Sequence, residues 1–139
     1  MNPGQNLIGF DRQTVSTPFT ISRGSRATVK RTVYGYNPDS ALEQAVDISS
    51  GQVTAIVWTL VPNLGKDVAA VLSKTLAASE ISLPNTGTDG VYLFAFDDSD
   101  TASLALGTYF GQLAIVSGGN RFKSQPYEVT VAAAANAGE

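Results

Sequence analysis

The sequence predicts an all-β protein, folded as a single antiparallel β-sandwich. Apolar and polar residues alternate at period two in several short runs, as expected of half-buried strands. Clusters of Gly, Pro, Asn, Asp and Ser separate these runs at regular spacing, which is typical of strands joined by turns. One run, residues 53–61, is apolar on both sides and therefore needs a layer against each face. A length of 139 residues suits one domain with one core.

The composition narrows the range of functions. The chain is 43% hydrophobic and 15% charged, which is globular but low in charge for a surface that meets only water. We therefore expect partners to cover part of the surface. The absence of cysteine and histidine excludes disulfides, thiolate metal sites and a Ser-His-Asp triad within the chain. A net charge of −3 argues against nucleic acid as the main partner, and we expect no cofactor.

Residues 1–18 are predicted to form a flexible N-terminal arm. Asn, Gln, Gly, Ser and Thr dominate it, and its few apolar residues follow no clear period. The side chains expected to form an assembly interface there are Leu7, Ile8, Phe10 and Arg12. A frayed terminus or a short edge strand is the alternative. We expect no signal peptide, membrane helix or membrane partner, because no apolar leader and no run of about 18 apolar residues is present.

The sandwich is predicted to occupy residues 19–131. Its second strand, residues 27–36, places Arg31 on one face with Val29 and Val33. A buried cation is costly unless it is paired, so we expect a bulge in this strand together with pairing of Arg31 to an acid. Contact of this face with another subunit is the alternative.

A turn and loop at 37–51 lead into the most apolar strand, residues 53–61. Trp58 lies on one side of this strand and is expected in the core. The other side is a further candidate assembly interface, formed by Val53, Ala55 and Val57. Because both sides are apolar, we expect the second side to meet another layer or a partner subunit.

Residues 67–79 fit two patterns. Their apolar residues fall at helical spacing behind a possible Asp67 cap, and they also alternate as in a strand. We favour a strand, because the neighbouring segments are strands and β-branched residues suit pairing. After a turn cluster at 84–90, residues 91–96 alternate with their aromatic side chains inward.

The stretch from Asp100 to Leu113 is predicted to be a structural corner that sets the entry of a central strand. Acidic residues break the preceding run, a leucine anchors the turn, a glycine allows it, and a tyrosine begins the inward face of the strand. The corner residues are Asp100, Leu104, Gly107 and Tyr109. A hairpin at 117–120 then leads to the last strand, and residues 132–139 are predicted to form a loose tail.

Acidic residues offer two further interpretations. Asp97, Asp98 and Asp100 supply oxygens of the kind that Ca²⁺ binds, but they lack the spacing of a known calcium loop, so we favour a solvated turn. Nothing in the sequence places two carboxylates on the walls of a cleft, as a glycosidase requires.

Residues 1–31 carry five cations and one acid, whereas residues 39–100 are acidic. Attraction between subunits could follow from this asymmetry, and chance clustering on a solvated surface is the alternative.

Five segments carry a resemblance to a known family. They are Arg23-Gly24, Lys74-Thr75, Gly90-Val91-Tyr92-Leu93-Phe94, Asp100-Thr101-Ala102-Ser103-Leu104 and Gly107-Thr108-Tyr109-Phe110-Gly111-Gln112-Leu113. In this order they resemble the immunoglobulin-like β-sandwich of tailed-bacteriophage virion proteins, of the type that forms the N-terminal domain of baseplate upper proteins. The resemblance spans residues 19–131 and departs at both ends and at Phe96-Asp97-Asp98.

The resemblance implies a non-enzymatic role in virion assembly. It implies a capsid decoration or cement protein, or a neck, tail or baseplate adaptor, made in the host cytoplasm and located in the virion. The partners would be other virion proteins, with the chain as a homo-oligomer or bound to a lattice. The alternative is a module that binds carbohydrate or another host-surface ligand through three exposed tyrosines, Tyr34, Tyr36 and Tyr92.

Overall fold

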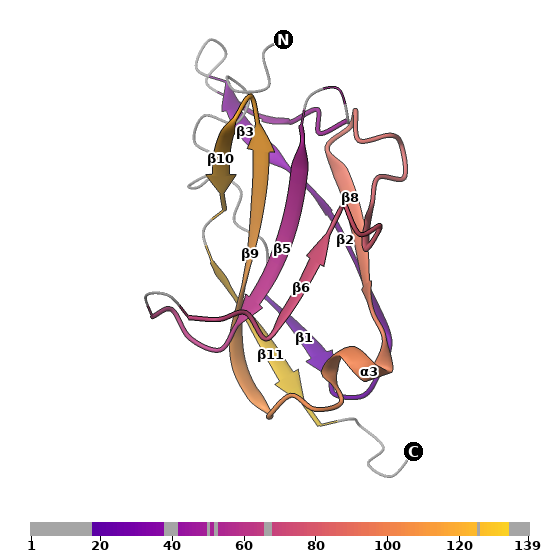
Figure 1. The fold of residues 1–139 in the computed structure, drawn as a ribbon, viewed down its shortest axis with the longest axis vertical. Helices are drawn as coiled ribbons and strands as arrows, with labels where there is room; N and C mark the ends of the chain where they lie inside the picture. Colours follow the sequence, from indigo (N-terminus) through magenta and orange to yellow (C-terminus); the bar gives the residue numbers. More distant parts are fainter. Residues whose placement is uncertain are drawn as a thin grey trace.

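Two β-sheets pack face to face in the computed structural model, which describes residues 18–37, 42–49, 51, 53–65, 68–124 and 126–133 (Figure 1). Turn clusters divide the chain into short strands, as the Gly, Pro and Asn positions require. The elements are β1 (Phe19–Ser22), β2 (Ala27–Thr32), β3 (Tyr34–Asn37), β4 (Leu42–Ala45), β5 (Ala55–Val61), β6 (Leu72–Thr75), β7 (Ile81–Ser82), β8 (Val91–Phe96), the short helix α3 (Asp98–Thr101), β9 (Gly107–Ser117), β10 (Asn120–Lys123) and β11 (Tyr127–Ala132).

The larger sheet has the strand order β1-β11-β9-β5-β6, with β10 also paired to β9. Its pairs are antiparallel except β1 and β11, which run parallel with Phe19 opposite Val129. Gly118 and Gly119, both at positive φ, form the predicted hairpin between β9 and β10. We call this sheet the large sheet, and the face turned away from the rest of the sandwich its outer face.

The smaller sheet has the order β2-β8-β7, and a β3–β4 hairpin extends from it. The two sheets together follow the connectivity of an immunoglobulin-like sandwich. β2, β8 and β7 take the places of strands B, E and D, and β5, β9 and β11 those of C, F and G. The prediction of an all-β sandwich is confirmed, although the pairing of β1 with β11 departs from purely antiparallel order.

The core lies between the sheets and centres on Trp58 of β5. Its ring lies 4.7 Å from that of Phe94 and 5.5 Å from that of Phe96, both on β8. The indole Nε1 donates a 2.7 Å hydrogen bond to the Tyr127 hydroxyl. Gly111 makes room for this pair, because a Cβ there would lie 3.1 Å from each of the two rings. Trp58 is fully buried, as the sequence predicted.

Several local expectations change in the structure. The predicted strand at 27–36 divides at Val33, where the chain leaves β8 and pairs with β4. The register of β2 with β8 is continuous, so the bulge expected near Arg31 is not formed. The loop expected before residue 51 contains strand β4. Residues 68–79 contain the short strand β6 and a turn, which decides between strand and helix in favour of strand.

The part of the chain that the structure describes contains no helix long and apolar enough to span a membrane. Residues 1–17 and 134–139 lie outside the described residues, and with them most of the predicted arm and tail.

Candidate functional site

The outer face of the large sheet carries an apolar centre. The cross-strand register places Ala55 of β5 opposite Val116 of β9, and Val57 opposite Ala114. All four side chains are half-buried, whereas the alternate residues of both strands are buried in the core. We call these four residues the flat half of the outer face. The described chain segment that lies over this side of β5 borders Thr59 and Val61 and is not among the contacts of the flat half.

The other half of the outer face is overhung by residues 62–65 and 68–71, which join β5 to β6 (Figure 1). A groove of about 500 Å³ lies beneath this segment. Its lining mixes apolar and polar side chains and consists of Thr59, Val61, Asn63, Leu64, Gly65, Val68, Gln112, Lys123 and Pro126. Leu64 at its rim is 60% exposed. We call this region the overhung half.

Three charged residues of the described part of the outer face lie on β10 and β11, which both pair with β9. Lys123 faces outward beside Ala114, Arg121 faces outward beside Val116, and Glu128 faces outward beside Phe110. The three charged side chains are exposed. The face therefore combines an apolar centre with charged residues along one side of it, and protein-binding surfaces likewise join apolar and polar regions.

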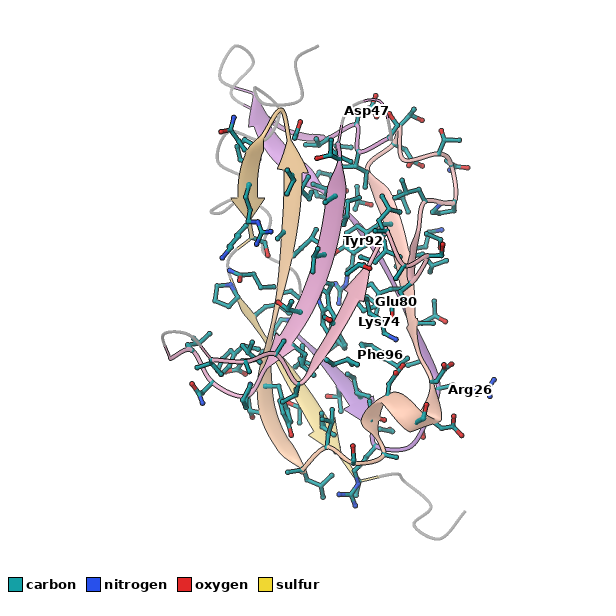
Figure 2. All side chains as sticks on the ribbon, in the orientation of Figure 1. Arg26, Asp47, Lys74, Glu80, Tyr92 and Phe96 are labelled. Carbon is teal, nitrogen blue, oxygen red and sulfur yellow. The ribbon has the colours of Figure 1, made fainter. Side chains whose placement is uncertain are left out.

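A second cluster gathers at the corner. Lys74, from the end of β6, is only 7% exposed. Its Nζ lies 2.8 Å from Oδ2 of Asp100 in α3 and 6.0 Å from the centre of the Phe96 ring. The same oxygen accepts a 2.8 Å hydrogen bond from the amide of Asp97. Figure 2 shows Lys74 and Phe96 pointing into this region from separate strands.

The pKa of Asp100 is lowered by these contacts. Burial alone raises the pKa, because it disfavours the charged carboxylate. The hydrogen bond from Lys74, the amide of Asp97 and the charge of Lys74 all act in the opposite direction, and together they outweigh burial. Asp100 is therefore held as a carboxylate that fixes α3 against β6.

The remaining corner residues also serve the fold. Tyr109 at the start of β9 donates a 2.7 Å hydrogen bond to the backbone oxygen of Ala105, which is the arrangement known as a tyrosine corner in immunoglobulin-like domains. Leu104 is buried and Gly107 has a φ of 144°. Thr101, fully buried, accepts a hydrogen bond from the amide of Gly24 and so ties the corner to the turn after β1.

The predicted assembly residues divide into two groups. The N-terminal set, Leu7, Ile8, Phe10 and Arg12, lies outside the described residues. Ala55 and Val57 lie on the outer face. Val53 does not, which corrects the prediction: it precedes β5, its amide bonds to the Ser49 oxygen, and its side chain is 3% exposed in the core.

The tyrosine surface proposed as an alternative is not formed as predicted. Tyr92 is 2% exposed and stacks against Phe94, with ring centres 6.2 Å apart. Its position on β8 turns it inward, as the alternation of that strand requires. Tyr34 is 43% exposed, and the side chain of Tyr36 lies outside the described residues.

Charged residues that sequence order separates lie together in the fold. The turn that holds Arg23 and Arg26 is bonded to the corner through Gly24 and Thr101. Figure 2 shows Arg26 at the same end of the molecule as α3, which carries Asp98 and Asp100. Arg31 is half-buried and lies 5.5 Å from the centre of the Phe19 ring.

Within the described residues, no group of three or more acidic side chains is arranged to hold a metal ion. The carboxylate of Asp100, one of the three acids considered for Ca²⁺, is bound to Lys74.

Sequence reasoning missed two parts of this surface. Ala114 and Val116 complete the flat half, and their half-burial follows from the same alternation that places Leu113 and Ile115 inward. The groove could not be foreseen, because it depends on where the segment after β5 folds back.

No protein-family model and no curated protein matches the sequence. Among solved structures, the chain is similar to the endo-β-1,4-mannanase from Thermotoga petrophila, at 13% identity and a TM-score of 0.46. The alignment covers 86% of this chain and spans 18% of the mannanase chain. Similarity at this level carries no argument about activity.

Proposed function

We propose that this chain is a non-enzymatic structural component of a tailed-phage virion, where it docks to other virion proteins through the outer face of the large sheet. The observation that carries the proposal is the half-buried apolar centre formed by Ala55, Val57, Ala114 and Val116. A strand that is apolar on both sides is normally covered on both. The cover is then supplied by a partner, as a capsid decoration protein or as an adaptor of the neck, tail or baseplate.

The resemblance to phage virion proteins supports the same proposal. Its segments occupy element boundaries: the turn after β1, the end of β6, the start of β8, the corner, and the start of β9. Two of these segments are joined by an ion pair between Lys74 and Asp100. Charged side chains that are used in an internal contact suit a scaffold that acts through its surface. They also leave no evident centre for a reaction within the described residues.

The test combines particle composition with an outer-face variant. Purified phage particles are expected to contain the chain in repeated copies by quantitative mass spectrometry and cryo-electron microscopy. Val57→Lys should reduce its incorporation, because a lysine would be placed in the apolar centre of the contact. Thr28→Lys, an exposed change on β2 of the small sheet, is the matched control and should incorporate normally.

Absence of the chain from purified particles would overturn the proposal. So would incorporation of Val57→Lys at the level of Thr28→Lys, provided that both variants unfold at the temperature of the parent chain.

A further inference from the structure

The two halves of the outer face have complementary shapes. The flat half offers four small or medium apolar side chains, Ala55, Val57, Ala114 and Val116. The overhung half presents Leu64, which is 60% exposed on the segment after β5. A leucine held this far out of the core beside an uncovered apolar surface is suited to insert into a surface of the same kind.

Two charges of opposite sign lie along one line of this face. Arg121 is paired with Val116 and Glu128 with Phe110, so that their positions are six residues apart along β9. This corresponds to about 20 Å along the strand, which is too far for an ion pair within one copy. Both side chains are exposed and project from the same side of the sheet.

We propose that the outer face binds a second copy of the chain in a two-fold dimer whose axis lies in the plane of the face, perpendicular to the strands. This inference rests on the proposed function and names the partner of the same surface. A rotation about an axis between Ala114 and Gln112 exchanges the two halves. Leu64 then meets the flat half of the second copy, and Arg121 meets Glu128 of the second copy, twice in each dimer.

The alternative axis, parallel to the strands, is less favourable. It would place the β6 edge of one copy over the β10 edge of the other, where the cations Arg121 and Lys123 lie. Two described acids beside β6 are already engaged within the chain: Oε1 of Glu80 accepts a hydrogen bond from the amide of Thr75, and Asp100 binds Lys74. The perpendicular axis instead uses the guanidinium group of Arg121 and the carboxylate of Glu128, which are both exposed on the face.

A charge exchange between copies tests this geometry. Arg121→Glu and Glu128→Arg should each raise the dimer Kd by about tenfold or more, because two like-charge contacts replace two attractive ones. An equimolar mixture of the two variants should recover the affinity of the parent chain, since every contact in the mixed dimer again joins opposite charges. Sedimentation velocity over a concentration series, with one variant fluorescently labelled, measures the dimer Kd of each variant and of the mixture.

A variant and a matched control test the contact that Leu64 makes in the proposed dimer. Leu64→Ser should weaken the dimer, whereas Leu106→Ser, at a leucine 49% exposed at the corner, should not. Both side chains are exposed, so neither change should alter thermal unfolding. Full affinity in the two single charge variants, or no recovery in their mixture, would overturn the proposed geometry, and a parent chain that stays monomeric would overturn the dimer itself.

The outcomes separate this inference from the proposed function. A monomeric chain that is still incorporated into particles through Val57 would remove the dimer and leave the virion role. A dimer that obeys the charge exchange, from a chain absent from particles, would remove the virion role and leave the dimer.

Discussion

One hydroxyl group determines how the chain enters β9. Tyr109 binds the backbone oxygen of Ala105 at 2.7 Å, and this closes the turn in which Gly107 takes a φ of 144°. An L-residue with a side chain rarely adopts such a φ. Space is not the constraint, because a Cβ on Gly107 would have no heavy atom within 4 Å.

Gly107→Ala isolates the effect of backbone conformation. We expect it to lower the free energy of unfolding by about 1–3 kcal/mol, from strain alone. The matched control is Gly51→Ala, where a Cβ also has no neighbour within 4 Å but φ is not positive. This control should leave stability unchanged or raise it slightly. Chemical denaturation monitored by Trp58 fluorescence measures both, and equal effects would show that φ at Gly107 is not the cause.

Residues whose role depends on neighbours in sequence were predictable, and those whose role depends on distant partners were not. The positions of Gly107 and Tyr109 in the corner follow from the residues that turns require and from the alternation of the strand. Lys74 gives no local sign that it is buried, because its partner Asp100 is 26 positions away. Val53 was misplaced for the related reason that alternation cannot be extended beyond the true start of a strand, here Ala55.

At the scale of elements, α3 is bonded to one strand and to one turn. Asp100 binds Lys74 at the end of β6, and Thr101 binds the amide of Gly24 after β1. A four-residue helix has little stability of its own. Its position therefore depends on these contacts, and the contact with Lys74 depends on the ionised state of Asp100.

Asp100→Asn should destabilise the fold by roughly 1–3 kcal/mol at pH 6, between the values typical of exposed and fully buried ion pairs. Because the pKa of Asp100 is lowered in the folded protein, its contribution is complete above the ordinary aspartate value and is lost as pH falls through the lower folded value. The difference between parent and variant should therefore shrink on acidification.

Urea denaturation at several pH values from 6 to 3 measures this difference. Asp98→Asn in the same helix is the control, since Asp98 is exposed and contacts only the adjacent amide of Ser99 in the bonds described for its side chain. A pH-independent difference for Asp100→Asn would show that the carboxylate is not acting through its charge.

The positions of most strands were predictable from alternation and turn residues, but their partners were not. β8 and β9 alternate clearly, and both were predicted with the correct inward face. The parallel pairing of β1 with β11 joins the two ends of the domain, and no local pattern encodes a contact across such a separation. The division of one predicted strand at Val33 likewise reflects a change of partner.

At the scale of the whole molecule, the fold was easier to infer than the function. The segments that carry the phage resemblance make the internal contacts of the sandwich, as the Lys74–Asp100 and Gly24–Thr101 bonds show. Residues of this kind therefore indicate the fold. The surface on which the proposed function rests consists of alanines and valines, and these residues form a continuous surface only when β5 and β9 are placed side by side.

Deletion of residues 1–18 tests the arm. The melting temperature should stay within about 3 °C of the parent value, because the core described here is built from residue 19 onward. Incorporation into particles should fall if the arm anchors on a neighbour. Differential scanning calorimetry and the particle assay measure the two effects, and a large loss of thermal stability would show instead that the arm belongs to the folded domain.

The parallel pairing of β1 and β11 has a mechanical consequence. Since the strands run in the same direction, the chain enters β1 at one end of the pair and leaves β11 at the other. A pull between the two termini is then directed along both strands. It loads the four paired positions from Phe19–Val129 to Ser22–Ala132 together in shear, instead of opening them one at a time. A domain connected in this way resists extension by a force applied between its first and last strands.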